Sequence, residues 1–280
     1  MKKRNLIALS IFVVFYISFG IFLTLNQEKV VYHPFPQDFQ SCSNFVEAEK
    51  ITYQGTRMYV STTTGPTVVL YHGNAGSACD RDFYAAQFVQ AEHGYIIVEY
   101  AGFSNDAREP SHELIKQDVE NVISYLKSEN IEKVIVAGES IGTGFATYHA
   151  SLAPPERLLL ISPFTNLSDI AKERFWFYPT SLLVDNALDN VESIKNYSGE
   201  VTIIHGAEDS IIPHKLGQRL FESILSEKNF ITITGVGHND LFTVQQTYTA
   251  IQDFLTQEAR FNVEVQHQLT HRLSIQCIQV

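Results

Sequence analysis

The sequence feature that most constrains the fold is Gly138-Glu139-Ser140-Ile141-Gly142, a serine with a glycine two positions before it and another two positions after it. The β-branched run 133–137 has the composition of a strand buried on both faces, and residues 143–150 have helical spacing. A serine on so sharp a strand-to-helix turn is held in a strained conformation that exposes its hydroxyl, and small flanking residues let the strand and the helix pass closely. This context predicts a nucleophile elbow with Ser140 as the nucleophile.

The rest of the chain predicts an α/β fold, in which a mostly parallel sheet of about eight strands is covered by helices on both faces. The expected strands are 45–53, 57–61, 67–72, 95–99, 133–137, 157–161, 201–205 and 229–234, and the expected helices are about 80–92, 112–129, 143–150, 213–225 and 240–255. These elements form one domain over 45–260. The aromatic segment 163–198 is expected to be an irregular cap insertion. Residues 261–280 do not fit the alternation, which leaves an extra strand or a loose tail open.

An apolar segment near the N-terminus is long enough to cross a bilayer. Three cations at residues 2–4 precede an almost unbroken apolar run of about 20 residues, Leu6 to Leu25. Ser18-Phe19-Gly20 offers a small-x-small cleavage site of a secretory signal peptide, but the apolar run continues past it. The continuing run favours a transmembrane signal anchor over 5–25, and a cleaved signal peptide is the alternative. Residues 26–44, with two prolines, are expected to be a connector.

The distribution of charge around this segment predicts its orientation. Lys2, Lys3 and Arg4 lie before it, whereas the first fifteen residues after it contain one cation, Lys29, partly offset by Glu28. The positive-inside rule then keeps residues 1–4 in the cytoplasm and sends the catalytic domain to a periplasm, a lumen or the cell exterior. Cleavage of a signal peptide would instead give a secreted protein.

Net charge and cysteine content exclude several classes of protein. The net charge of −11 argues against nucleic acid as a partner and against electrostatic adhesion to acidic lipid. The chain has three cysteines, Cys42, Cys79 and Cys277. Their odd number and wide spacing are typical neither of a disulfide framework nor of the ligands of a zinc site. A bridge such as Cys42 to Cys79 is possible in an oxidising compartment, but the favoured interpretation is three separate buried thiols. The sequence implies no metal and no cofactor.

A serine hydroxyl is a poor nucleophile and needs a base within hydrogen-bond reach. His238 lies in a glycine-rich loop directly after the last expected strand, which makes it the candidate base. Asp209 follows the next-to-last strand and is the candidate acid that orients the imidazole, with Glu208 and Asp169 as alternatives. The chain order of serine, acid and histidine fits a catalytic triad on an α/β sheet.

The oxyanion of a tetrahedral intermediate needs preformed hydrogen-bond donors. The candidates are the backbone N–H of Ile141, directly after the nucleophile, and that of Asn74 in the loop after the third strand, with Ala75 as second choice.

Four other histidines are given structural interpretations. His205 ends an apolar strand and is interpreted as a packed core histidine, and His72 is expected to brace the loop after it. His267 and His271 share a helical spacing without further ligands, which is usually incidental.

Taken together, these segments resemble the α/β-hydrolase superfamily. More narrowly, they resemble its N-terminally membrane-anchored α/β-hydrolase-domain proteins and bacterial relatives described as serine aminopeptidase-like or lysophospholipase-like. The resemblance covers 45–257 and is carried by His72-Gly73-Asn74-Ala75-Gly76, Tyr100–Ser104, Gly138–Gly142, Ser162–Leu167, Asp185 with Asp189-Asn190, His205–Pro213 and Gly237-His238-Asn239. It implies catalytic Ser140, Asp209 and His238. The chain departs from the pattern at Ala101, where relatives carry arginine, and at Ser104, where they carry glycine.

The expected function is hydrolysis of an ester or thioester of a small-molecule or acyl substrate through an acyl-enzyme, with the membrane contacted through the N-terminal helix. A peptidase or amidase is an alternative, and a non-catalytic, membrane-tethered binding protein is another. The aromatic run 175–178 in the cap predicts an acyl or aromatic pocket lined by Trp176, Phe177 and Tyr178, unless these side chains pack into a core of the cap itself.

Overall fold

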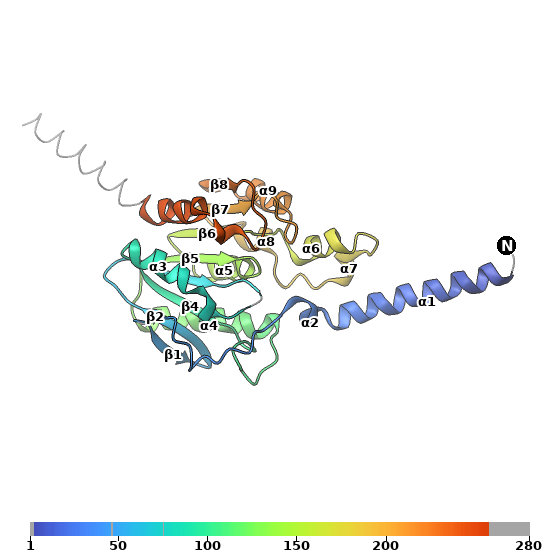
Figure 1. The fold of residues 1–280 in the computed structure, drawn as a ribbon, viewed down its shortest axis with the longest axis horizontal. Helices are drawn as coiled ribbons and strands as arrows, with labels where there is room; N and C mark the ends of the chain where they lie inside the picture. Colours follow the sequence, from blue (N-terminus) through green and yellow to red (C-terminus); the bar gives the residue numbers. More distant parts are fainter. Residues whose placement is uncertain (1–2, 46, 75, 258–280) are drawn as a thin grey trace, which may run out of the picture.

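The computed structural model describes residues 3–45, 47–74 and 76–257 and has an eight-stranded sheet at its centre (Figure 1). The strand order is β1-β2-β4-β3-β5-β6-β7-β8, with β1 and β2 antiparallel and the pairs from β4 to β8 parallel. The strands are β1 Glu49–Tyr53, β2 Thr56–Ser61, β3 Thr67–Tyr71, β4 Gly94–Glu99, β5 Val134–Glu139, β6 Arg157–Ile161, β7 Glu200–Gly206 and β8 Lys228–Ile233. The predicted α/β class is confirmed.

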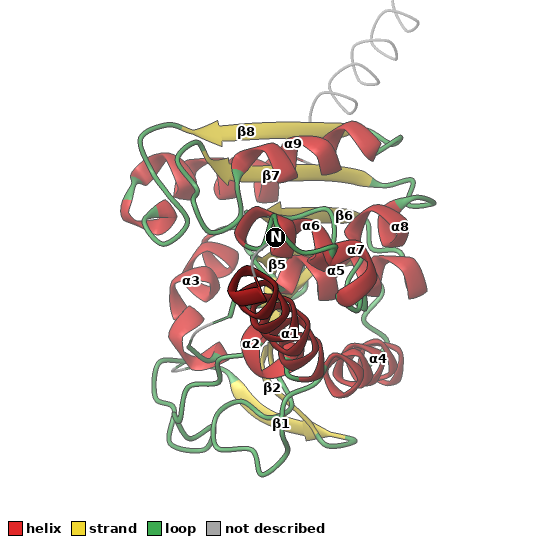
Figure 2. Ribbon diagram, turned by 90° about the vertical axis from the view of Figure 1, so that its right-hand side faces the viewer, coloured by secondary structure: helices red, strands yellow, loops and turns green. Residues whose placement is uncertain are grey.

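Helices cover both faces of the sheet, as Figure 2 shows for α3 on one side and α4 and α5 on the other. The bounds are η1 Ala78–Arg81, α3 Asp82–Gln90, α4 His112–Ser128, α5 Gly142–Leu152, α9 His214–Ser223 and η2 Leu241–Thr243, followed by a helix over 245–257. Successive residues of the fully buried strand β3 enter opposite cores. Val69 packs in the core on the α4 and α5 face, and Val68 packs with α3 on the other. A strand covered on both faces is necessarily apolar throughout.

The cap insertion is more ordered than expected, because 163–198 contains three short helices. These are α6 Leu167–Arg174, α7 Thr180–Leu183 and α8 Asn190–Ile194. The side chain of Asn166 caps α6 by accepting the N–H of Asp169 at 2.9 Å, and Asp189 caps α8 through the N–H of Glu192 at 3.0 Å. Helices this short carry too few residues for a periodic signal, so only their caps mark them in the sequence.

The N-terminal segment forms α1 Lys3–Leu25, which projects from the domain beside the cap (Figure 1). In the described part of the chain it is the one helix long and apolar enough to cross a membrane. Only 6% of its most apolar window is buried. A core helix of a soluble domain would be mostly buried, and α1 differs from such a helix in its exposure.

The segment expected to be a connector is instead packed on the domain. A short helix, α2 Gln27–Val31, directly follows α1, and the side chains of Tyr32 and Phe39 are buried. The hydroxyl of Tyr32 lies 2.6 Å from Nδ1 of His112 at the start of α4. The domain therefore begins close to the end of α1.

Cys42 and Cys79 form a disulfide, so the interpretation of three separate buried thiols is wrong for these two. The packed segment after α2 brings Cys42 against η1, a proximity that a separation of 37 residues does not indicate. Cross-linking a loop of this length stabilises a fold by about 2–4 kcal/mol. The third thiol, Cys277, lies outside the described residues, as do His267, His271 and the whole of 261–280.

Candidate active site

Ser140 occupies a strained turn between β5 and α5. Its φ is +54°, in the left-handed region that side-chain-bearing residues rarely adopt. Two hydrogen bonds hold the turn. The N–H of Ser140 donates to the Ile161 carbonyl at 2.8 Å, and the Thr143 hydroxyl donates to the Ser140 carbonyl at 2.7 Å. The strand–turn–helix geometry of a nucleophile elbow is therefore present.

The two glycines around this turn are required by close backbone contacts. A Cβ on Gly138 would lie 2.7 Å from the Gly142 carbonyl oxygen. A Cβ on Gly142 would lie 2.6 Å from the His72 carbonyl oxygen and would overlap that of Tyr71. Backbone atoms of buried strands cannot move aside, so only glycine fits at either position.

The structure brings the three predicted triad residues together. Nε2 of His238 lies 2.9 Å from Oγ of Ser140, and Nδ1 of His238 lies 2.7 Å from Oδ2 of Asp209. The two alternative acids lie elsewhere. Glu208 is exposed, and Asp169 pairs with Arg219 at 3.0 Å.

Asp209 is held as a buried carboxylate with several donors. Its side chain is fully buried, and Oδ1 accepts the N–H groups of Ile211 at 2.9 Å and Ile212 at 2.8 Å. Burial alone would raise the pKa of Asp209, but hydrogen bonds from His205 and His238 outweigh it and hold the pKa well below its usual range. Asp209 is therefore charged and can stabilise a protonated imidazole.

His205, interpreted from the sequence as a packed histidine, is also a second neighbour of the acid. Its Nε2 lies 3.3 Å from Oδ2 of Asp209 and 3.0 Å from the Ile212 carbonyl oxygen. Both neighbours are acceptors, so Nε2 carries the proton. Helix α9 crosses directly over the ring at Gly217, where a Cβ would lie 3.0 Å from Cε1 of His205. His205 is thus a positioning residue for Asp209.

The loop after β3 is tied to the segment that follows α2. The side-chain amide of Asn74 donates to the Val31 carbonyl, and its oxygen accepts the N–H of His33 at 2.9 Å. Asn74 and Ile141, whose backbone N–H groups are the candidate oxyanion donors, both line the cavity beside Ser140. The second-choice donor, Ala75, lies outside the described residues.

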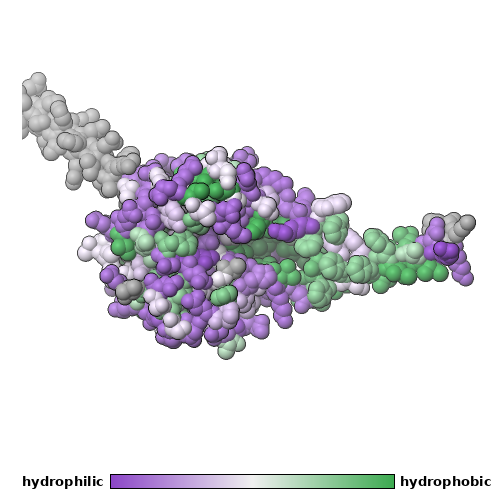
Figure 3. All heavy atoms as spheres, viewed as in Figure 1, coloured by the Kyte–Doolittle hydropathy of each residue, from purple (hydrophilic) through white to green (hydrophobic). Residues whose placement is uncertain are grey.

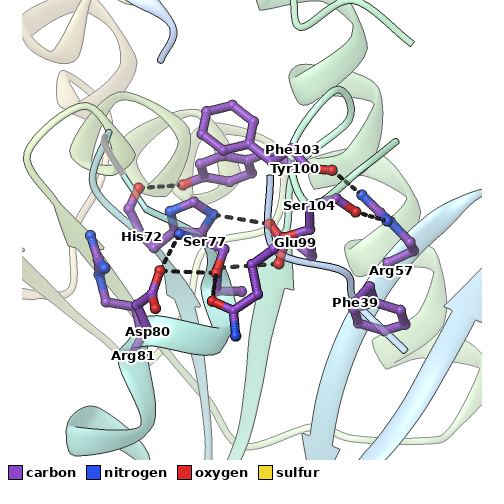
Figure 4. Close-up of polar contacts among 12 residues, drawn as sticks. Phe39, Arg57, His72, Ser77, Asp80, Arg81, Glu99, Tyr100, Phe103 and Ser104 are labelled. Carbon is purple, nitrogen blue, oxygen red and sulfur yellow. Dashed lines mark hydrogen bonds and ion pairs between the residues drawn. The ribbon is translucent and has the colours of Figure 1, made fainter. Parts of the chain in front are cut away.

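A buried polar network supports this loop from below (Figure 4). Nδ1 of His72 donates to the Gly73 carbonyl at 2.7 Å, the Tyr100 hydroxyl donates to the His72 carbonyl at 2.7 Å, and Glu99 accepts the N–H of Ala78 at 3.2 Å. Burial lowers the pKa of His72 to about 3 and raises that of Glu99 to about 7. The 3.8 Å approach of Nε2 of His72 to Oε1 of Glu99 therefore involves a neutral imidazole and is not an ion pair.

An ion pair lies next to the nucleophile. Nε of Arg81 is 2.8 Å from Oε2 of Glu139, the residue before Ser140, and both side chains line the cavity. Glu139 fits because Gly73 has no side chain, since a Cβ there would lie 2.7 Å from Oε1 of Glu139. The sequence gives no direct signal for this long-range pair.

The triad opens into an apolar cavity of about 710 Å³. Apart from the residues already named, it is lined by α1 and α2 (Gly20, Leu23, Thr24, Gln27, Val30, Val31) and by the cap and neighbouring loops (Phe164, Leu167, Ile170, Ala171, Arg174, Phe175, Tyr178, Thr180, Leu183, Val184, Ile211, Ile212, Phe242). The contribution of α1 was not predicted. Its signal is the pair of small residues Gly20 and Thr24, four apart in a bulky apolar run, a spacing typical of close helix packing in membranes.

Of the three aromatic residues expected to line a pocket, Tyr178 lies in the wall of this cavity. Trp176 and Phe177 lie outside the lining and are 79% and 47% exposed. The N–H of Tyr178 donates to the Phe175 carbonyl at 2.8 Å, which closes a tight turn. Four consecutive side chains on such a turn cannot all face one side.

Among the residues that the structure describes, no group of three or more histidine, cysteine or carboxylate side chains is arranged so that it could hold a metal ion.

No protein-family model matches the chain, but two characterised or catalogued relatives are similar to it in sequence. It is 28% identical over 258 residues to the uncharacterized protein Rv2307c of Mycobacterium tuberculosis, a match that covers 85% of this chain and 90% of that protein. It is 27% identical over 186 residues to the lysophosphatidylserine lipase ABHD12 of Gallus gallus. That second match covers 59% of this chain and about half, 49%, of the lipase.

Solved structures share the fold at low sequence identity. Est1E from Butyrivibrio proteoclasticus superposes with a TM-score of 0.65 at 16% identity, over 76% of this chain and 100% of that one. The esterase Est2 from Thermogutta terrifontis gives a TM-score of 0.61 at 16% identity, and the match covers 80% of this chain and 96% of that one. The strand order, the elbow and these likenesses define an α/β-hydrolase fold. The chain has this fold, as predicted, and it is similar in sequence to Rv2307c and to part of ABHD12.

The buried carboxyl of Glu99 predicts a pH dependence of stability. Its pKa is about 7 in the fold against an ordinary 4.5, so the folded protein retains a proton that the unfolded chain releases. The stability that this group contributes is therefore fully present below about pH 4.5. As the pH rises from there to about 7, the free energy of unfolding falls by up to about 1.4 kcal/mol per pH unit. Glu99→Gln mimics the protonated form and should remove this loss.

The measurement is the thermal midpoint of the detergent-solubilised protein from pH 5 to pH 8. The variant should match the wild type at pH 5 and exceed it by roughly 3 °C or more at pH 8. Asp118, whose pKa burial raises to about 6, is present in both proteins and cancels in the difference. Parallel curves for the two proteins would contradict the assignment.

Proposed function

We propose that this chain is a serine hydrolase that cleaves carboxylic esters of amphiphilic acyl compounds through an acyl-enzyme. The observation that carries the proposal is the hydrogen-bonded series Asp209–His238–Ser140, with separations of 2.7 and 2.9 Å, at the base of a mainly apolar cavity. The strained elbow beneath Ser140 supports the same conclusion, because strain of this kind persists where function requires it.

In the proposed reaction, Nε2 of His238 accepts the proton of the Ser140 hydroxyl as Oγ attacks the ester carbonyl. Asp209 holds the imidazole through Nδ1 and stabilises its protonated form. The backbone N–H groups of Ile141 and Asn74 donate to the oxyanion. His238 then returns the proton to the leaving alcohol, and a water molecule, deprotonated by the same imidazole, hydrolyses the acyl-enzyme and frees Ser140.

The shape and chemistry of the cavity favour an acyl substrate. Apolar side chains of α1 and the cap form much of its wall, and about 710 Å³ is within the range of sites that enclose a small molecule. The relative ABHD12 is named as a lipase of lysophosphatidylserine, an ester with one acyl chain, which supports an ester over an amide. Thioesters require the same machinery. The intact hydrogen-bonded triad disfavours the non-catalytic binding protein.

The test is turnover by the purified full-length chain of p-nitrophenyl esters of increasing acyl length, acyl thioesters and aminoacyl amides, together with labelling by a fluorophosphonate. Ser140→Ala should abolish labelling and lower kcat by three orders of magnitude or more, an estimate from triad removal in other hydrolases.

Ser162 is a matched control, because it also ends a buried strand with positive φ and its N–H bonds to the next strand. Ser162→Ala should keep labelling and turnover. Equal labelling of the wild type and Ser140→Ala, or amides cleaved in preference to esters, would overturn the assignment.

We further propose that α1 is a membrane anchor and that the catalytic domain lies outside the cytoplasm. Lys3 and Arg4 begin α1, directly before its apolar run, which supports a cytoplasmic N-terminus. The disulfide between Cys42 and Cys79 independently supports an oxidising compartment, since cytosolic thiols are kept reduced.

Protease added to sealed cells or spheroplasts that express the chain should digest the domain while cytoplasmic markers survive. Thiol alkylation before lysis should find Cys42 and Cys79 oxidised. Full protection until lysis together with free thiols would contradict this orientation, and a soluble form beginning near Ile21 would indicate a cleaved signal peptide.

A further inference from the structure

One face of the apolar helix α1 is covered by the catalytic domain. Gly20 is buried and Tyr16, Phe19, Leu23 and Thr24 are half-buried, whereas the other described side chains of α1 are exposed. These five residues follow the i, i+3, i+4, i+7, i+8 spacing of a single helical face. A helix that served only as a tether would have no such face.

Directional contacts join this face to the cap. The rings of Tyr16 and Tyr178 stack with centroids 4.4 Å apart. The Tyr16 hydroxyl donates to the Phe177 carbonyl at 2.7 Å, and the Tyr178 hydroxyl donates to the Tyr16 carbonyl at 2.7 Å. A Cβ on Gly20 would lie 2.9 Å from the Tyr178 ring, so glycine permits this approach.

The cavity that contains Ser140 extends to this same face. Gly20, Leu23 and Thr24 of α1 form part of its wall, and Leu183 and Val184 of the cap form another part. The cavity therefore extends from the nucleophile to the contact between α1 and the cap.

The tip of the cap beside α1 is itself apolar and exposed. The ten residues 175–184 include no charged side chain, although Arg174 and Asp185 flank them directly. Trp176 is 79% exposed and Leu182 is 83% exposed. In Figure 3 apolar surface continues from α1 onto the adjoining side of the domain. An apolar surface that carries an exposed tryptophan is typical of a membrane-contacting segment.

The point at which the cap contacts α1 indicates how deeply the cap would lie in a bilayer. At about 1.5 Å per residue, Tyr16 lies roughly 14 Å along the helix axis from Leu25. The hydrocarbon core is about 30 Å thick, so a helix crossing it would carry the contact between Tyr16 and the cap into the leaflet on the Leu25 side.

We propose that 175–184 of the cap inserts into the leaflet that α1 crosses, and that the cavity between them is a lateral portal through which the acyl chain of a membrane lipid ester reaches Ser140. This inference rests on the proposed hydrolase function for its substrate, but the insertion of the cap does not. A substrate entering here keeps its acyl chain in apolar surroundings throughout, so it need not cross water to reach the nucleophile.

Trp176 is the one tryptophan of the whole chain, so its fluorescence reports the position of the cap directly. In full-length protein reconstituted into phosphatidylcholine vesicles, lipids brominated along the acyl chain should quench the emission, and aqueous iodide should not. The control is a double variant, Trp176→Phe with Leu225→Trp, which moves the tryptophan to another highly exposed apolar position. Iodide should quench the emission of this variant. Quenching of Trp176 by iodide and not by brominated lipid would overturn the inference.

A second experiment tests the portal. Leu23→Trp fills the cavity wall on α1, whereas Ile21→Trp adds the same side chain on the exposed side of the helix. With a hexadecanoyl ester presented in vesicles, Leu23→Trp should lower kcat/KM about tenfold or more. Each methylene group that can no longer be buried in the cavity should lower kcat/KM by a factor of about four. Turnover of an acetyl ester should fall by a much smaller factor, because its acyl group does not extend to α1, and Ile21→Trp should resemble the wild type for both esters.

The outcomes separate the inference from the function on which it rests. If esters of every length were inert, the hydrolase proposal would fail while the fluorescence result still placed the cap. If both esters were cleaved and Leu23→Trp lowered kcat/KM equally for both, or for neither, the portal would be contradicted while the hydrolase function stood.

Discussion

The close approach of β5 and α5 at Gly138 and Gly142 is the constraint on which the rest of the site depends. A Cβ at either glycine would collide with backbone oxygen atoms, so glycine permits this approach, and Ser140 between them adopts a positive φ. The serine hydroxyl is thereby fixed at the end of a buried parallel strand rather than on a mobile loop. Every other group of the candidate site is positioned against this fixed point.

Parallel strands bring those groups to the same edge of the sheet. Asn74 follows β3, Ser140 follows β5, Asp209 follows β7 and His238 follows β8, so four separate loops converge where the strands end. Each loop has its own support. The His72 network lies beneath the loop after β3, and backbone N–H groups with His205 hold Asp209. Such support is what keeps a triad within the narrow geometry that proton transfer requires.

The fold class and the proximity of Ser140, Asp209 and His238 were predictable because the relevant signals are local. The elbow, the alternation of strands and helices, and the chain order of serine, acid and histidine are all readable from short segments. Sequence reasoning failed where partners distant in sequence decide the outcome. Nothing in the residues around Cys42 and Cys79 specifies their pairing, and the exposure of Trp176 depends on how a tight turn meets α1. The small residue Gly20 was the available hint that α1 packs on the cap.

The proposed hydrolytic centre and the apolar helix α1 share one cavity. The most direct measurement is a crystal structure of the full-length chain inhibited by a long-chain alkyl phosphonate, which mimics the tetrahedral intermediate. The account predicts a covalent bond from phosphorus to Oγ of Ser140, a phosphoryl oxygen that accepts the N–H groups of Ile141 and Asn74, and an alkyl chain that runs toward Leu23 of α1. Phosphorus bound to another residue, or an alkyl chain that leaves the cavity away from α1, would contradict it.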